Sequence, residues 1–164
     1  MAKTTRTSRQ LQNTPPSIQT LGWREWVALP ELGIPAIKAK LDTGARTSAL
    51  HAFRIEPFAS NHIPKVRFWL HPLQKNRSIE LVCEARLMDR RTVKDSGGHA
   101  EQRYIIESPV CIGDQQWNIE ISLTDREDMM FRMLLGRTAM TDGHLTIDPA
   151  TSYVTGRGLR KAYK

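Results

Sequence analysis

Cysteine is scarce in this sequence: Cys83 and Cys111 are the only two in 164 residues, and both lie in apolar, strand-like settings. Two cysteines are too few for the disulfide framework of a small secreted domain. We therefore expect buried thiols in a reducing compartment, with a single disulfide left open as the alternative. The chain also lacks the roughly 20 consecutive apolar residues of a membrane span and the apolar segment of a secretory signal. We expect a cytoplasmic protein with no membrane partner.

Motifs for metal and nucleotide cofactors are also missing. There is no His-Glu-x-x-His, no Cys-x-x-Cys and no pair of histidines at helical ligand spacing, and the five histidines are scattered along the chain. No glycine-rich loop ends in Gly-Lys-Ser or Gly-Lys-Thr, so nothing supports ATP binding. The sequence therefore predicts neither a metal site nor a cofactor.

Apolar residues, by contrast, make up 40% of the chain, enough for one domain with a substantial core. Apolar and polar residues alternate in runs that predict one strand after another, at residues 37–41, 66–70, 79–87, 103–112 and 117–123. One short helix is indicated, near the C-terminal end. This pattern favours a small, mainly antiparallel barrel or sandwich.

The composition changes near both ends of the chain. Residues 1–20 combine Thr, Ser, Gln, Asn and Pro with scattered cations and little periodicity, so we expect a disordered basic arm. Residues 155–164 contain two glycines and four cations, and we expect a flexible basic tail. Residues 21–154 are predicted to form the single domain.

The most informative motif is the segment 42–45, Asp-Thr-Gly-Ala. It follows the predicted strand at residues 37–41, which delivers the Asp42 carboxylate into a tight turn. Gly44 is expected to take a backbone conformation that residues with a Cβ avoid, and the Thr43 hydroxyl can fix the turn. Such a carboxylate suits hydrolysis by an activated water molecule when a second carboxylate lies beside it. Taken alone, Asp-Thr-Gly is equally compatible with an ordinary turn.

A second motif, Met-Leu-Leu-Gly-Arg at residues 133–137, precedes the short predicted helix, a glycine at position 143 and a closing strand at residues 145–148. In this order the two motifs resemble those of the retropepsin-like aspartic proteases. The string from 40 to 52 is similar to the RimB-like bacterial family once labelled "ATP-dependent zinc proteases". The resemblance runs from about residue 23 to residue 149.

The resemblance implies a mainly β fold, a small closed antiparallel barrel of retropepsin type with one short C-terminal helix. In that fold Gly136 lets an apolar strand pack against the catalytic loop. Asp42, Thr43 and Gly44 would be catalytic, and Ala45 would lie beside them in the substrate site.

Residues 94–101 contain the pair Gly97-Gly98 followed by His99, between two predicted strands. Paired glycines are compatible with a plain hairpin tip. In the family this position resembles the glycine-rich flap that closes over bound peptide, so the resemblance implies that Gly97, Gly98 and His99 contact substrate. The two interpretations are compatible, because a flap is a hairpin that moves.

Aspartic proteases use two close carboxylates that share one proton. This sequence has one Asp-Thr-Gly. Asp142 and Asp148 lack the setting of a strand followed by a turn, so neither resembles a second catalytic loop. A working pair of carboxylates then needs two chains, each contributing Asp42, and we expect a homodimer.

One position departs from the viral retropepsins, which carry an acid shortly after the catalytic motif that pairs with the arginine of Gly-Arg. This sequence has Arg46 there, so we expect Arg137 to lack that partner and both guanidinium groups to bind substrate carboxylates. The alternative is that Arg46 faces solvent or pairs with Asp125 or Glu127. The net charge of +7 agrees with an acidic partner.

Two functional classes follow. The resemblance implies an aspartic peptidase acting on an acidic peptide or protein tail, namely the glutamate-extended tail of a ribosomal protein, because the family often accompanies ATP-grasp glutamate ligases of the RimK type. The alternative is a non-catalytic adaptor of the same fold that binds the ligase or the ribosome. RNA binding is weaker, since no aromatic stacking motif accompanies the basic residues. An intact Asp-Thr-Gly favours the peptidase.

Overall fold

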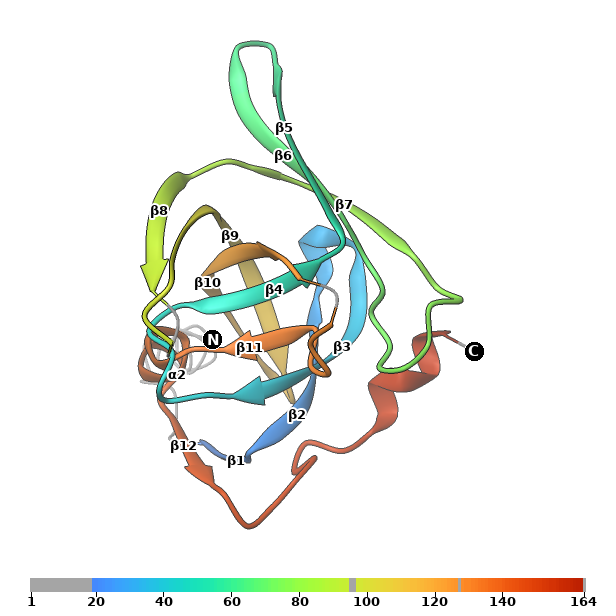
Figure 1. Cartoon of the computed structure of the whole chain (residues 1–164). Helices are drawn as coiled ribbons and strands as arrows, with labels where there is room; N and C mark the ends of the chain where they lie inside the picture. The colour runs from blue at the N-terminus through green and yellow to red at the C-terminus, as the bar shows by residue number, and fades with distance from the viewer. Residues whose placement is uncertain (1–18, 95–96, 127, 164) are drawn as a thin grey trace, which may run out of the picture.

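Strands make up most of the structure, a computed structural model that describes residues 19–94, 97–126 and 128–163 (Figure 1). The strands are β1 (Gln19–Gly22), β2 (Arg24–Leu29), β3 (Ile34–Leu41), β4 (Ser48–Ala52), β5 (Arg54–Ser60), β6 (Ile63–Leu70), β7 (Leu81–Arg86), β8 (Asp89–Lys94), β9 (Ala100–Ile112), β10 (Gln115–Asp125), β11 (Met133–Leu135) and β12 (Leu145–Asp148). The helical segments are the 3-10 helices η1 (Pro30–Leu32) and η2 (Gly158–Tyr163) and the α-helix α2 (Arg137–Asp142). The predicted mainly β class and the short helix after Gly-Arg are confirmed. None of the helices in these ranges is long and apolar enough to cross a membrane.

The main sheet has the strand order β10-β4-β11-β3-β2-β9-β8 among the described residues. β10, the first strand of this order, also pairs with β9. Each of the strands from β10 to β9 in this order therefore pairs with two others of the same set. The sheet is mixed, since β10 runs parallel to β4 and β11 runs parallel to β3. The expectation of an antiparallel arrangement is wrong at these pairs. Parallel neighbours need a long crossover, and the chain supplies one by forming β5 to β9 between β4 and β10.

A second sheet, β5-β6-β7, is antiparallel, and its β5–β6 hairpin projects from the body of the molecule (Figure 1). One face of this sheet is apolar because its side chains alternate. Val66 and Phe68 of β6 are completely buried, and Cys83 of β7 is nearly so. This face packs into the hydrophobic core and anchors the base of the hairpin.

The main core is also formed by strands in which buried apolar side chains alternate with more exposed ones. On β3 the side chains of Ile37, Ala39 and Leu41 are buried, whereas Lys40 is exposed. Burying apolar area is the main favourable contribution to folding. The same alternation fixes the direction in which the polar side chains of β3 point, because a shift of one residue would exchange its two faces.

Both cysteines are free, Cys83 buried and Cys111 half-buried. Burial raises the pKa of the Cys83 thiol to about 12, so it stays protonated at neutral pH. The expected thiols are present, and the alternative of a disulfide between these two residues does not apply to this structure.

The ends of the domain differ from the expected boundaries. Residues 1–18 of the expected arm lie outside the described residues, while Gln19 and Thr20 already belong to β1, which pairs with β12. Within the segment expected to be a flexible tail, the 3-10 helix η2 contacts β2 and β3. Its Tyr163 hydroxyl exchanges hydrogen bonds with the backbone of Ala36.

A buried carboxylate fixes the start of this C-terminal segment. Glu25 of β2 is completely buried. It accepts hydrogen bonds from the backbone N–H groups of Gly22 (2.7 Å), Val154 (3.0 Å) and Thr155 (3.1 Å) and from the Thr155 hydroxyl (3.1 Å). Buried polar groups are stable when hydrogen-bonded, so Glu25 ties the C-terminal segment to β2.

Candidate active site

Asp42 lies directly after β3, and its backbone continues the pairing of that strand. Its N–H donates to the carbonyl of Leu135 on β11 at 2.9 Å. The side chain is half-buried. Two neighbouring strands therefore fix the position from which the carboxylate points.

The turn after Asp42 is held by the carboxylate itself. The N–H of Gly44 donates to Asp42 Oδ1 at 2.9 Å, and the N–H of Ala45 donates to the Asp42 carbonyl at 3.3 Å. Gly44 is not among the glycines with positive φ, so the expectation that it needs a conformation closed to other residues is wrong. A Cβ at Gly44 would instead lie 3.1 Å from Asp42 Oδ1. The glycine therefore matters because it leaves room beside the carboxylate.

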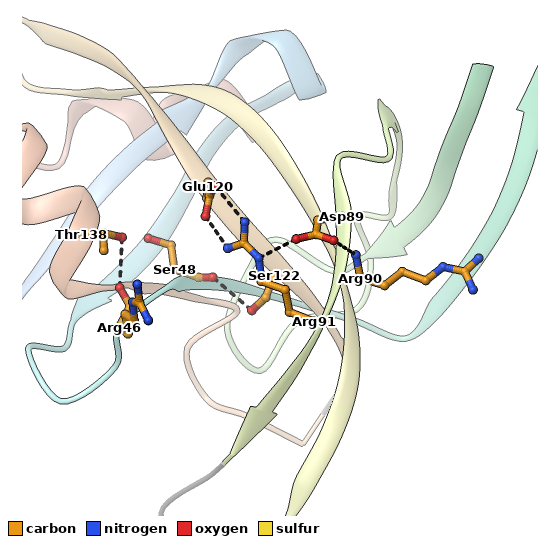
Figure 2. A network of polar contacts seen from close by, with 8 residues as sticks. All are labelled: Arg46, Ser48, Asp89, Arg90, Arg91, Glu120, Ser122 and Thr138. Atoms are coloured by element: carbon orange, nitrogen blue, oxygen red, sulfur yellow. Dashed lines mark hydrogen bonds and ion pairs between the residues drawn. The ribbon is translucent and has the colours of Figure 1, made fainter.

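Gly136 brings the Gly-Arg motif against the loop that follows Asp42 (the Asp42 loop, residues 42–48). A Cβ there would lie 2.5 Å from the carbonyl carbon of Thr47 and 2.8 Å from the nitrogen of Ser48, distances that no real Cβ tolerates. The Gly136 N–H donates to Ser48 Oγ at 3.0 Å, and the Ser48 carbonyl accepts from Ser122 Oγ of β10 at 3.1 Å (Figure 2). The expected packing role of Gly136 is thus present, with Ser48 as a partner that the sequence did not indicate.

The first turn of α2 is hydrogen-bonded to the same loop. The N–H of Arg137 donates to the Ala45 carbonyl at 2.7 Å. The Arg46 carbonyl accepts from the N–H of Thr138 at 3.1 Å. It also accepts from the Thr138 hydroxyl at 3.0 Å (Figure 2). The loop from Asp42 to Ser48 is therefore held by β11 and α2, two elements distant in sequence.

The Arg137 side chain has a partner that the sequence did not reveal. Its Nη1 donates to the Thr43 carbonyl at 3.0 Å. The prediction that Arg137 would be left without a partner is wrong, because a backbone oxygen can replace the missing acid. Arg137 thereby supports the Asp42 turn, although its side chain is exposed.

Arg46 is exposed and lines a cavity of about 390 Å³. Its lining residues include Thr47 of the loop, Thr138 of α2, Arg91 of β8 and Glu120 of β10. The pKa of Glu120 is lowered mainly by its hydrogen bonds from Arg91 and to a lesser extent by the positive charge of Arg46. Of the two acids considered as partners, Asp125 has no ion pair with Arg46, and Glu127 lies outside the described residues.

Arg91 of β8 forms an ion-pair network on the far wall of this cavity (Figure 2). Its Nη1 and Nη2 donate to the two carboxylate oxygens of Glu120 on β10, at 2.6 and 3.1 Å, and its Nε donates to Asp89 Oδ2 at 2.8 Å. These hydrogen bonds raise the pKa of Arg91 and lower the pKa of Asp89. No local sequence pattern indicates this network, since Arg91 and Glu120 come together only because β8 and β10 both pair with β9.

The predicted hairpin is present: β8 and β9 pair from Asp89–Ile105 to Lys94–Ala100. Gly97, Gly98 and His99 lie at its exposed tip, and Gly98 has φ +82°. Because Arg91 and Arg46 line one cavity, the stem of the hairpin lies beside the Asp42 loop. Contact of the tip with substrate stays a prediction.

The remaining acidic candidates have other settings. Asp142 ends α2 and is exposed, and Asp148 Oδ1 accepts from the N–H of Ala150 at 2.9 Å in a turn after β12. Within the described ranges, no group of three His, Cys, Asp or Glu side chains could hold a metal ion.

Comparison with known proteins finds curated relatives that are named as probable alpha-L-glutamate ligases. The chain is 48% identical over 136 residues to a probable alpha-L-glutamate ligase of Shewanella pealeana, and 44% identical over 147 residues to one of Desulfotalea psychrophila. These matches cover 83% and 87% of this chain but only 30% and 32% of the relatives. The chain therefore spans about a third of the length of these curated relatives.

A solved structure shares the fold. A Legionella pneumophila protein of unknown function superposes with a TM-score of 0.70 at 28% identity, covering 84% of this chain and 98% of that one. The family model described as the retropepsin-like aspartic endopeptidase RimB matches residues 20–158, from β1 to the first residue of η2. This chain belongs to the RimB-like family of retropepsin-like aspartic endopeptidases.

Proposed function

We propose that this protein is an aspartic peptidase that hydrolyses peptide bonds in an acidic, glutamate-extended protein tail. The observation that carries the proposal is the setting of Asp42. A half-buried carboxylate at a strand end accepts the Gly44 N–H, in a loop fixed by β11 and α2. Membership of the RimB-like family supports the same reaction class.

In the proposed mechanism two copies of the chain each contribute Asp42. The two carboxylates share one proton, because two close negative charges repel each other. The ionised carboxylate takes a proton from water, whose oxygen attacks the peptide carbonyl carbon, while the protonated carboxyl donates a hydrogen bond to the carbonyl oxygen. As the C–N bond breaks, the leaving amine receives a proton from the pair. The two groups titrate as a unit.

The surrounding residues have supporting roles in this proposal. Thr43 and Gly44 shape the turn, with the Arg137 guanidinium holding the Thr43 carbonyl. We also propose that the strands from β10 to β9 in the main sheet form the closed barrel of a retropepsin. The β8–β9 hairpin would act as the flap that excludes bulk water when peptide is bound.

Preference for acidic substrates is supported by Arg46 and by the net charge of +7. The Arg46 side chain is exposed beside the catalytic turn, and a guanidinium binds a carboxylate through paired hydrogen bonds. Arg137 has a supporting role instead, because its guanidinium donates to the Thr43 carbonyl and so holds the loop.

A second candidate is an adaptor or regulatory module for a glutamate ligase, with the ribosome as a further partner. One observation favours it: the curated relatives named as probable alpha-L-glutamate ligases contain a segment similar to this chain within a sequence about three times as long. The adaptor alternative gives no reason for the intact Asp42 turn, so the peptidase is preferred. Cleavage of a tail and binding of the enzyme that extends it are also compatible.

The proposal is tested by incubating the protein with a peptide that ends in a run of glutamates and analysing the products by mass spectrometry. We expect cleavage by the unaltered chain, none by Asp42→Asn, and weaker cleavage of a matched glutamine peptide. EDTA should have no effect, since the proposed mechanism uses water activated by carboxylates. Full activity of Asp42→Asn, or inactivation by chelator with recovery on adding zinc, would refute the aspartic mechanism. An intact, folded chain that binds the ligase but cleaves neither peptide would favour the adaptor.

A further inference from the structure

Three cations converge on one tyrosine ring on the outer side of β2 and β3. The guanidinium carbons of Arg24 and Arg157 lie 4.8 and 4.6 Å from the ring centroid of Tyr153, and the ammonium nitrogen of Lys38 lies 5.6 Å from it. Tyr153 and Arg157 come from the C-terminal segment, which is tied to β2 where the Tyr153 N–H donates to the Arg24 carbonyl at 3.0 Å. We call these four residues the Tyr153 cluster.

Among the described residues, no acid forms an ion pair with a cation of the Tyr153 cluster. The nearby Glu25 carboxylate is hydrogen-bonded to backbone N–H groups and the Thr155 hydroxyl instead. Their polar partners are neutral: Arg24 Nε donates to Ser152 Oγ and Lys38 Nζ donates to Gln74 Oε1, both at 3.2 Å. Like charges this close lie within about one Debye length of one another and repel. An anion bound among them would remove that repulsion.

Tyr153 itself carries two further signs of an incomplete site. Its backbone has φ +54°, a left-handed conformation that is uncommon for a residue with a large side chain. Its hydroxyl is buried and has no hydrogen-bond partner, although buried polar groups are usually paired. The fold thus holds the ring among the three cations at an energetic cost, which favours a functional reason.

The cluster is connected to the catalytic turn by β3. Side chains alternate along a strand, so Lys38, Lys40 and Asp42 point to the same face of the sheet, and Asp42 continues the pairing of β3 with β11. Lys38 lies four residues before Asp42, roughly 13 Å along an extended strand. An extended peptide that places its scissile bond at Asp42 needs about four more residues to reach the cluster.

We propose that the Tyr153 cluster is a second binding site for the acidic substrate, which holds carboxylates of the glutamate tail some distance from the cleaved bond. This inference rests on the proposed function, and it specifies the surface that binds the glutamate tail. Lys40, exposed between the cluster and Asp42, continues the path of positive charge. The protein would then bind long glutamate tails more tightly than short ones.

The chemistry of the cluster favours carboxylates over RNA. Guanidinium groups match carboxylates in planar, paired hydrogen bonds. Binding of single-stranded nucleic acid also uses exposed aromatic faces on which bases stack. Here cations already lie over the rings: Arg24 is 4.5 Å from the ring centroid of Trp23 as well as close to Tyr153.

The test measures binding separately from cleavage. The full chain carrying Asp42→Asn is titrated with a fluorescent peptide that ends in a long run of glutamates, and affinity is followed by anisotropy. Adding Lys38→Gln or Arg157→Gln should weaken binding by about tenfold or more each, tenfold being the low end of the range for loss of one charge-assisted hydrogen bond. Arg160→Gln is the matched control, because it removes an exposed charge from the same segment outside the cluster. It should change affinity less than twofold.

Several results would overturn the inference. Equal losses for Arg160→Gln and Arg157→Gln would mean that only net charge matters. Unchanged peptide affinity in both cluster variants would remove the site, as would a loss of affinity for a single-stranded RNA probe without a loss for the peptide. Thermal unfolding of each variant with and without peptide checks the fold, and the peptide should raise the midpoint less in the cluster variants. Intact cluster-dependent binding with no cleavage by the unaltered chain would refute the proposed function but leave this site standing.

Discussion

At Gly136 the fold leaves no room for a side chain. Because a Cβ there would lie 2.5 Å from the backbone of Thr47, Gly136→Ala should displace the Asp42 loop from α2. We expect a loss of about 2–4 kcal/mol in the free energy of unfolding, in the range of severe overpacking, together with loss of peptidase activity. Urea unfolding measures the first and peptide cleavage the second.

Gly158→Ala is the matched control for this change. A Cβ at Gly158 meets nothing within 4 Å, and its φ is not positive, so the substitution should alter stability by less than about 0.5 kcal/mol. Equal effects of the two substitutions would show that close packing at Gly136 is not what holds the loop.

His51 should make the protein less stable in acid. It is buried on β4, its Nδ1 contacts the Thr124 hydroxyl, and its Nε2 has no partner. Burial, followed by the charges of Arg126, Arg103 and Arg132, lowers its pKa from 6.5 to about 4.

Between these two values the unfolded chain binds a proton that the folded chain excludes, so the stabilisation is complete above pH 6.5 and is lost as the pH falls toward about 4. The loss is at most about 3 kcal/mol. Unfolding free energies measured across this window should fall less steeply for His51→Gln than for the unaltered chain. Parallel curves for the two proteins would contradict the assignment.

At the scale of elements, the ion pairs of Arg91 connect the β8–β9 hairpin to β10. The side chains of Arg91 and Glu120 are each 41% exposed, and exposed pairs contribute little to global stability, about 1 kcal/mol or less. Arg91→Gln should therefore leave the unfolding midpoint nearly unchanged but increase hydrogen exchange in β8, because the hairpin opens more often.

Arg54→Gln provides the comparison, since it breaks an ion pair with Glu56 on the projecting β5–β6 hairpin. It should leave exchange in β8 unchanged. Faster exchange in β8 for both variants, or for neither, would contradict the role assigned to Arg91.

The predicted strands were largely recoverable from the sequence because their side chains alternate. The runs at 66–70 and 117–123 lie within β6 and β10, and the short helix after Gly-Arg is α2. The strand β8 shows no such alternation, since both of its faces are largely exposed. The parallel pairs depend on contacts between distant segments, which a local pattern cannot specify.

The candidate site was also predictable only where a local motif marks a residue. Asp42 and the packing role of Gly136 follow from local motifs. The partner of Arg137 is the Thr43 carbonyl, and a backbone acceptor has no signature in the sequence. The Tyr153 cluster likewise joins β2, β3 and the C-terminal segment, so its cations meet only in the folded chain.

At the scale of the whole molecule, the account requires two chains for one site. Each chain supplies a single Asp42 turn, and a closed two-fold pair would bring two such turns together. Light scattering over a dilution series should show a dimer, and activity per chain should fall as the dimer dissociates. A monomer that keeps full activity at every concentration would be incompatible with a shared pair of carboxylates.

The most direct test mixes the unaltered chain with Asp42→Asn at constant total concentration and allows the subunits to exchange. If both carboxylates are needed, mixed dimers are inactive and cleavage of the glutamate peptide falls with the square of the unaltered fraction. An equal mixture should then retain about a quarter of the starting activity, because only that share of randomly formed dimers carries Asp42 on both chains. A linear decrease, with about half of the activity left in the equal mixture, would mean that each chain acts alone and would contradict the account.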